Sequence, residues 1–327
     1  MARKALLVGI NDYKGISDLR GCINDVTNMR NILKTYLGFR NEEIRMLTDS
    51  RATKANILFR LNWLVRGAKA GDFIVFHFSG HGSQIRDRDG DELADQMDEL
   101  ICPYDMNWDN GFITDDDLNN IFSKLPQGVL LEVFLDSCHS GTGLRALESD
   151  LGRPPELGPE VQVQITSYRK DRFLPPPADI IARVEGEEEE LRPMARFTDI
   201  ARDSTHHILW AGCRSDQTSA DAYINGSYNG AFTYYLCRHI RDANNSISRS
   251  ELVRRVRQSL VHARFSQVPQ LETEVTARQL RTFSLAERKS DGSLAARPRP
   301  ATSAPRKKTT STVPSSSPRM TTVKVAK

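Results

Sequence analysis

A cysteine and a histidine each follow an apolar segment of the chain. The stretch VFLDSCHSGTG (133–143) places Cys138 two residues after Asp136, and residues 74–82 end in SGHG around His81. A thiol beside an imidazole is the minimum for nucleophilic catalysis, because the histidine takes the thiol proton and later gives it to the leaving amine. The plainer interpretation is that Cys138 is a small buried residue and that Asp136 caps the next helix.

The carboxylate beside Cys138 needs an explanation, because a negative charge disfavours formation of a thiolate. Residues i and i+2 of an extended segment share a face, so Asp136 should point with Cys138, and Ser79 with His81. Glycines flank His81 and would let a substrate carbonyl approach the backbone, where the amides of Gly82 and Cys138 could form an oxyanion hole. The pattern therefore predicts a pocket, with a carboxylate in it, beside a nucleophile.

Strand and helix patterns alternate in the first half of the chain. Short apolar runs predict strands, and apolar residues with helical spacing predict helices. Continuous apolar strands that alternate with helices indicate an α/β fold with a mostly parallel sheet covered on both faces. Ligands bind beyond the carboxyl ends of such strands, so His81 and Cys138 meet if their strands are neighbours. The expected strands are 4–11, 43–49, 72–80, 99–105 and 128–136, and the expected helices are 22–37, 53–66 and 114–125.

The second half divides differently. Residues 146–204 contain PPE, PPP and EGEEEE with weak periodicity, which predicts a linker or processing loop instead of a packed core. A strand at 206–213, helices at 230–240 and 248–263 and a last strand at 279–285 are expected next. This piece is small for an independent core, which favours one sheet built from two segments. The predicted organisation is 1–145, linker 146–204, 205–285 and a disordered Ser/Thr/Pro-rich tail, 286–327.

Charge and cysteine content narrow the classes of function. The tail from residue 286 carries ten Lys and Arg against two Asp and Glu, so the rest of this +3 chain is acidic and does not suggest a nucleic-acid partner. There is no long apolar span, and none of the five cysteines forms a CxxC pair. We therefore expect a cytoplasmic protein without a membrane partner, a zinc knuckle or a disulfide framework. The cysteines are Cys22, Cys102, Cys138, Cys213 and Cys237.

SGHG followed by DSCHSG resembles the caspase-type cysteine peptidases, specifically the metacaspases. Other stretches agree with this family in the same order: GCINDV (21–26), DRDGDELADQMDELICPYD (87–105), GCRSDQTSAD (212–221), GAFTYYL (230–236) and SQVPQLE (266–272). The resemblance covers most of residues 4–285. It implies the caspase-hemoglobinase fold, with 1–145 as the large-subunit segment and 205–285 as the small-subunit segment.

The same resemblance assigns roles to single residues. His81 and Cys138 match the catalytic dyad, and four positions match the first specificity (S1) pocket, which takes Arg or Lys in metacaspases: Cys22, Asp25, Ser79 and Asp136. Two carboxylates in one pocket independently favour a guanidinium or ammonium group. The expected activity is therefore an endopeptidase that cuts proteins after Arg or Lys. Basic residues of the linker would be sites of self-cleavage: Arg169, Lys170, Arg172, Arg183, Arg192 and Arg196.

Many metacaspases need calcium, and the resemblance places such a site at Asp98, Asp115 and Asp116. A further aspartate of that site is expected near Arg145, where the nearest acids are Glu148 and Asp150. Hard oxygen ligands suit calcium, whereas an arginine would oppose it, so calcium as an activator is left open. Residues 115–117 also read as a plain helix N-cap cluster.

Other interpretations remain. A caspase-fold interaction module that has lost catalysis is the rival class, and the intact dyad argues against it. A legumain-like peptidase shares the dyad but is disfavoured by GCINDV and SQVPQLE. His77 and His81 have the i, i+4 spacing of a helical zinc pair, but they lie in a strand pattern, so no metal is expected there. The chemistry needs no cofactor, and the resemblance implies a monomer.

Overall fold

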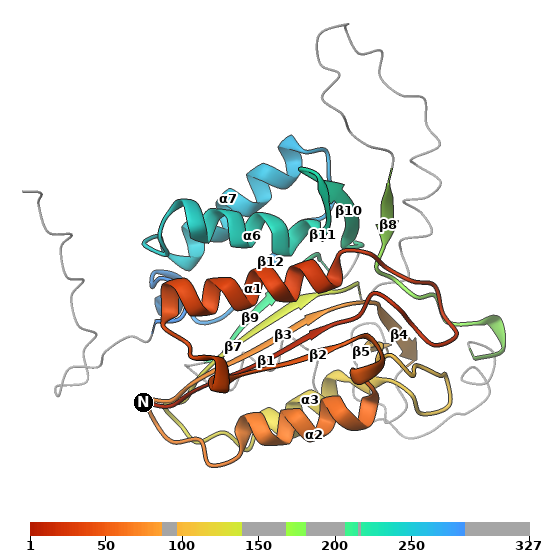
Figure 1. Cartoon of the computed structure of the whole chain (residues 1–327), viewed down its shortest axis with the longest axis horizontal. Helices are drawn as coiled ribbons and strands as arrows, with labels where there is room; N and C mark the ends of the chain where they lie inside the picture. Colours follow the sequence, from red (N-terminus) through yellow and green to blue (C-terminus); the bar gives the residue numbers. More distant parts are fainter. Residues whose placement is uncertain (87–96, 139–167, 181–206, 215–216, 285–327) are drawn as a thin grey trace, which may run out of the picture. The chain divides into compact units, whose positions relative to one another are not determined.

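The structure, a computed structural model, describes residues 1–86, 97–138, 168–180, 207–214 and 217–284. These residues belong to one structural unit, Met1–Ala286 (Figure 1). The expected tail and most of the expected linker lie outside the described residues. So do Arg145, Glu148 and Asp150.

A six-stranded sheet forms the centre of the unit, in the order β12-β9-β7-β3-β1-β2 (Figure 1). All neighbouring strands are parallel except β12, which runs antiparallel to β9. The prediction of a mostly parallel α/β sheet is thus confirmed, and a strand that follows the linker joins the same sheet. The strands are β1 (Arg3–Gly9), β2 (Ile44–Thr48), β3 (Phe73–Ser79), β7 (Leu130–Asp136), β9 (His207–Ala211) and β12 (Gln270–Glu272).

Helices cover both faces of this sheet. Figure 1 shows α1 (Cys22–Leu37), α6 (Ala231–Asp242) and α7 (Arg249–His262) on one face, and α2 (Lys54–Val65) and α3 (Asp115–Phe122) on the other. Alternate strand residues serve the two faces, because successive side chains of a strand point in opposite directions. In β1, Leu6 and Val8 join one hydrophobic cluster, whereas Ala5 and Leu7 join the other.

Local signals explain where the helices begin and end. The side chains of Thr53, Thr114 and Ser248 cap α2, α3 and α7 by accepting a hydrogen bond from the backbone amide three residues later. Gly38 ends α1 with a φ of 67°, a conformation that glycine adopts without strain. No helix in the described part of the chain has the length and apolar character needed to cross a bilayer.

Two of the expected strands are corrected by the structure. In the described part of the last expected strand, residues 279–284, no strand forms; Arg281 makes an isolated bridge, and the chain turns at Phe283, whose φ is 63°. The edge strand is β12 instead. The strand expected at 99–105 is β5 (Met97–Ile101), which pairs with β4 (Gly82–Arg86) and β6 (Ile113–Thr114) in a separate small sheet.

A second small sheet was not predicted from the sequence. It joins β8 (Arg169–Asp171), β10 (Ala220–Ile224) and β11 (Ser227–Gly230) in the order β11-β10-β8, all antiparallel. β10 and β11 form a hairpin across Asn225 and Gly226, both with positive φ. Strand β8 lies inside the segment expected to be an unpacked linker, so that expectation is wrong for residues 169–171.

Candidate active site

The two strands that precede the dyad are neighbours. β3 and β7 run parallel with Ser79 opposite Asp136, so the chain leaves both strands at the same edge of the sheet. His81 and Cys138 follow two residues later, and both are buried. The sheet therefore positions the two predicted catalytic residues together, as neighbouring parallel strands must.

The His81 ring is held in one orientation. Its Nε2 lies 2.7 Å from the Ser17 carbonyl, which can only accept, so Nε2 carries the proton and Nδ1 is free to take one. Within the described residues Nδ1 has no hydrogen-bond partner. Burial lowers the pKa of His81 to about 4, while the carbonyls of Ser17 and Arg172 act in the opposite direction. The imidazole is therefore neutral near pH 7, as a general base must be.

The Cys138 thiol is held by the backbone of Ser219. Its Sγ accepts a hydrogen bond from the Ser219 amide and lies 3.3 Å from the Ser219 carbonyl. In the described part of the chain it makes no hydrogen bond to His81. The thiol therefore has to turn from Ser219 toward the imidazole before it attacks. Such a change is common, because catalytic hydrogen bonds often tighten only when substrate is bound.

The other cysteines are poor candidates for the nucleophile. Burial raises the pKa of the Cys22, Cys102 and Cys237 thiols. Cys213 lies beside Cys138, and the hydrogen bond between the two thiols together with burial raises the pKa of Cys213. A raised pKa keeps a thiol protonated and unreactive. The location of Cys138 just after β7, the neighbour of the strand that precedes His81, favours it as the nucleophile.

A buried acidic pocket lies next to the dyad. Asp25 from the first turn of α1, Ser79 from the end of β3 and Asp136 from the end of β7 are all fully buried. Asp221 on β10 joins them. Cys22 lies close enough to Ser79 and Asp25 for both to influence the pKa of its thiol. The structure thus brings the four residues predicted for the S1 pocket together and adds a third carboxylate.

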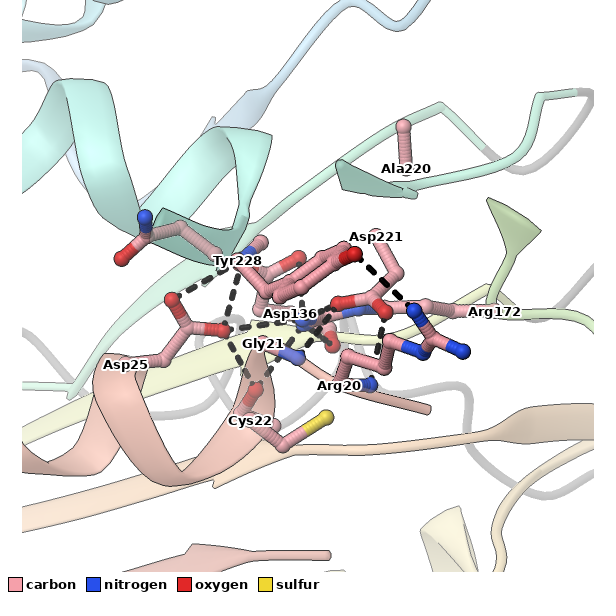
Figure 2. Close-up of polar contacts among 12 residues, drawn as sticks. Arg20, Gly21, Cys22, Asp25, Asp136, Arg172, Ala220, Asp221 and Tyr228 are labelled. Atoms are coloured by element: carbon pink, nitrogen blue, oxygen red, sulfur yellow. Dashed lines mark hydrogen bonds and ion pairs between the residues drawn. The ribbon is translucent and has the colours of Figure 1, made fainter. Parts of the chain in front are cut away.

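An arginine of the chain itself fills this pocket (Figure 2). The Arg172 Nη2 lies 2.9 Å from Asp25 Oδ2 and 3.1 Å from Asp221 Oδ1, and Nη1 lies 3.2 Å from Asp136 Oδ1. Nη1 also donates to Ser79 Oγ at 2.9 Å and to the Asp136 carbonyl at 2.9 Å. Burial alone would lower the pKa of Arg172, but the surrounding carboxylates raise it well above its usual value. The pocket is therefore complementary to a guanidinium cation.

The pKa of the Asp25 carboxyl is shifted by its surroundings. Burial raises the pKa of Asp25 to about 7, and repulsion from Asp136 adds to this rise. The Arg172 cation and the hydrogen bond from Ser79 act in the opposite direction. The charge of the pocket consequently changes near neutral pH.

The backbone of Arg172 is also held by hydrogen bonds. Its amide donates to the Ser219 carbonyl at 3.0 Å, and its carbonyl accepts from the Gly82 amide at 2.9 Å. Leu174 then donates to the Gly82 carbonyl at 2.9 Å. The chain passes through the site in extended form, with the Arg172 carbonyl on one of the two amides predicted for the oxyanion hole. The Cys138 amide stays a prediction for the second.

Several residues of the site were not identified from the sequence. Asp221 is the last residue of the GCRSDQTSAD stretch, so a signal for it was present without a role attached. Arg172 was one of six basic linker residues with nothing to distinguish it. Tyr13, which accepts a hydrogen bond from the His81 amide at 2.8 Å, and Ser17 lie in a loop that carries no motif.

The predicted calcium ligands lie away from this pocket. The β5–β6 pairing places Asp98 near the start of α3, where Asp115 and Asp116 lie, and Asp98 and Asp115 are buried. Considering only the described residues, no three His, Cys, Asp or Glu side chains form a group that could hold a metal ion. The calcium site stays a prediction, since its other acidic candidates, Glu148 and Asp150, lie outside the described residues.

Comparison with known proteins identifies relatives over most of the chain. A family model described as the metacaspase, peptidase C14 domain matches residues 3–147. Metacaspase-1 of Pyricularia oryzae is 36% identical over 284 residues, covering 82% of this chain and 71% of the relative. Metacaspase-1 of Ajellomyces capsulatus is 36% identical over 288 residues, covering 82% of this chain and 79% of the relative.

A solved structure supports the fold independently. The crystal structure of a protein from Geobacter sulfurreducens superposes with a TM-score of 0.61 and covers 88% of this chain and all of its own length. The two sequences are 22% identical, so this likeness concerns the fold alone.

Proposed function

Because this chain belongs to the metacaspase family of C14 cysteine peptidases, we propose that it cuts peptide bonds after Arg or Lys with Cys138 and His81. The observation that carries this specificity is the Arg172 guanidinium among Asp25, Asp136 and Asp221. A cation this well matched to a buried pocket indicates what the pocket binds in a substrate.

The proposed reaction begins with a proton transfer within the dyad. His81 Nδ1 takes the thiol proton, and the Cys138 sulfur attacks the carbonyl carbon of the residue in the pocket. Negative charge develops on the carbonyl oxygen, where the Gly82 amide already donates a hydrogen bond. The imidazolium then protonates the leaving amine and the C–N bond breaks. Water hydrolyses the resulting thioester and returns the thiol and the imidazole to their starting states.

We also propose that the bond between Arg172 and Phe173 is a site of self-cleavage. Arg172 is held like the residue on the acyl side of a scissile bond, because its side chain fills the pocket and its carbonyl contacts Gly82. Until it is cut, the same segment excludes other substrates. Self-processing is therefore a step that activates the enzyme toward proteins in trans. Calcium stays a prediction as the activator of that step.

A peptide panel tests the specificity. Full-length protein is assayed with and without calcium on fluorogenic peptides that end in Arg, Lys or Asp, alongside Cys138→Ala. Cleavage of the Arg and Lys peptides, abolished in Cys138→Ala, is expected. Cleavage of the Asp peptide without the Arg peptide would disprove the assignment of the pocket. Undiminished activity in Cys138→Ala would disprove the mechanism.

A further inference from the structure

The strand that delivers Arg172 to the pocket makes side-chain contacts of its own. β8 pairs antiparallel with β10, with Asp171 opposite Ala220 and Arg169 opposite Ala222. Along β8 the side chains alternate, so Arg169 points to the opposite side from Lys170. Lys170 Nζ donates to the Asp18 carbonyl on the α1 side, whereas Arg169 reaches the end of α7.

Arg169 is bound by a compact set of groups. Its Nη1 donates to the Arg264 carbonyl at 2.7 Å, and its Nη2 donates to the Ala263 carbonyl at 3.0 Å. The guanidinium carbon lies 4.3 Å from the centre of the Phe265 ring. The cation is also close enough to Tyr235 to counteract the rise that burial causes in the pKa of its phenol. Two acceptors and an aromatic face thus contact one guanidinium.

The end of α7 builds this set from a helix-termination motif. The Arg264 amide bonds to the Val261 carbonyl, and the Phe265 amide bonds to the Leu260 carbonyl, while Arg264 adopts a φ of 59°. This is a Schellman ending, in which the chain reverses in the left-handed conformation and a hydrophobic residue packs back onto the helix. It leaves the Ala263 and Arg264 carbonyls outside the helical ladder and places Phe265 beside them. The negative end of the helix dipole adds to their attraction for a cation.

We propose that the carbonyls of Ala263 and Arg264 and the ring of Phe265 form a second specificity subsite, which selects arginine three residues before the residue in the acidic pocket. This subsite rests on the proposed function, because it reads substrates that the dyad cleaves. Counting from the scissile bond, Arg172 is P1 and Arg169 is P4. A preferred substrate therefore carries two arginines with two residues between them.

The chemistry favours arginine over other residues at P4. A planar guanidinium stacks on a ring and donates two separate hydrogen bonds at the same time, which a lysine ammonium does not do with the same geometry. The pairing of β8 with β10 sets the spacing, because it holds the backbone from Arg169 to Asp171 extended, with Arg172 directly after it. At P2, by contrast, Asp171 accepts a hydrogen bond from Thr218 at 3.0 Å, a contact that a small polar residue also makes.

The test compares peptides that differ only at P4. Acetylated Arg-Lys-Asp-Arg, Lys-Lys-Asp-Arg and Ala-Lys-Asp-Arg fluorogenic peptides are assayed with calcium on full-length protein. They are also assayed on full-length Arg172→Gln, whose linker presents no cation to the acidic pocket. We expect kcat/KM for the P4 Arg peptide to exceed that for the P4 Ala peptide about fivefold or more. The P4 Lys peptide should lie between them.

Substitutions of Phe265 test whether its ring is responsible for the preference for arginine at P4. Phe265→Leu should bring the Arg-to-Ala ratio close to one, and Phe265→Tyr, which keeps the ring, should preserve it. Phe59→Leu is the matched control, because Phe59 is an exposed ring on α2, across the sheet. A ratio near one in the unmodified enzyme would show that Arg169 only latches the linker and would overturn the subsite, while P1 Arg cleavage still supports the proposed function. A ratio unaffected by Phe265→Leu would overturn the location. No cleavage of any peptide would overturn both.

Discussion

The carboxylate of Asp136 interacts with three different residues. Its Oδ1 accepts from Ser219 Oγ at 2.6 Å and faces Arg172, while its Oδ2 accepts from the Thr233 amide at 3.0 Å and from Thr233 Oγ1 at 2.7 Å. The carboxylate beside the nucleophile is thus compensated by a pocket cation and neutral donors. This explains how Asp136 and Cys138 coexist two residues apart.

Replacing Asp136 tests that explanation. Asp136→Asn should lower kcat/KM for Arg peptides about a hundredfold, because one partner of a buried cation is lost. The rate of iodoacetamide alkylation of Cys138 should not fall, since no negative charge is added near the thiol. Asp117→Asn, in the first turn of α3, is the matched control. Slower alkylation with unchanged peptide affinity would contradict the role given to Asp136.

The raised pKa of Asp25 predicts a pH dependence of substrate binding. Its pKa of about 7 applies with Arg172 bound, and loss of that cation removes an influence that lowers it. A substrate guanidinium prefers the ionised carboxyl, so KM for Arg peptides should rise as the pH falls from the alkaline side toward about 7. Asp25→Asn should raise KM and flatten this dependence, whereas Glu42→Gln at an exposed site should leave the profile unchanged. An identical acid limb in Asp25→Asn would assign the titration to another group.

Among the secondary-structure elements, strand β8 brings Arg172 to the site, and the sequence pattern does not predict it. Helices α2, α3 and α7 were predicted from patterns such as apolar residues at helical spacing, because those signals are local in the sequence. A three-residue strand carries no such signal and exists only through its pairing with β10, about fifty residues later. Cys22, Asp25, Ser79 and Asp136 were identified because they lie in stretches that resemble metacaspase motifs, whereas the roles of Asp221 and Arg172 became visible only in the folded chain.

Emptying the pocket tests the linker as an internal competitor. Arg172→Gln keeps a side chain of similar length but removes its positive charge, so β8 should dissociate more readily from the acidic pocket. Cleavage of small Arg peptides in trans should increase about tenfold or more, because a tethered ligand competes at a millimolar effective concentration. Lys14→Gln removes an exposed cation elsewhere and should change nothing. Lower activity of Arg172→Gln would mean that the segment supports the site instead of blocking it.

The central sheet should keep the two fragments of the cleaved molecule together. A cut after Arg172 divides the chain between β8 and β9, yet β9 pairs with β7 over the register from Leu131 to Leu135. The two pieces also share the buried ion pair of Glu132 with Arg249, at 3.0 Å. Pieces joined through a common core do not separate without unfolding.

Gel filtration of the cleaved protein tests this association. The two fragments should elute together near the volume of the uncut chain and separate only in denaturant. Glu132→Gln should weaken the association, because it leaves Arg249 buried without its carboxylate partner at a cost of about 3–5 kcal/mol. Separate elution of the native fragments would contradict a shared sheet.

Mass mapping of self-cleavage tests the central claim most directly. Full-length protein, Cys138→Ala and Arg172→Gln are incubated with and without calcium, and the termini of all fragments are identified by mass spectrometry. A cut between Arg172 and Phe173 is predicted in the unmodified chain and in neither variant. The same cut appearing in Cys138→Ala, or a cut after Asp171 in place of Arg172, would contradict the account.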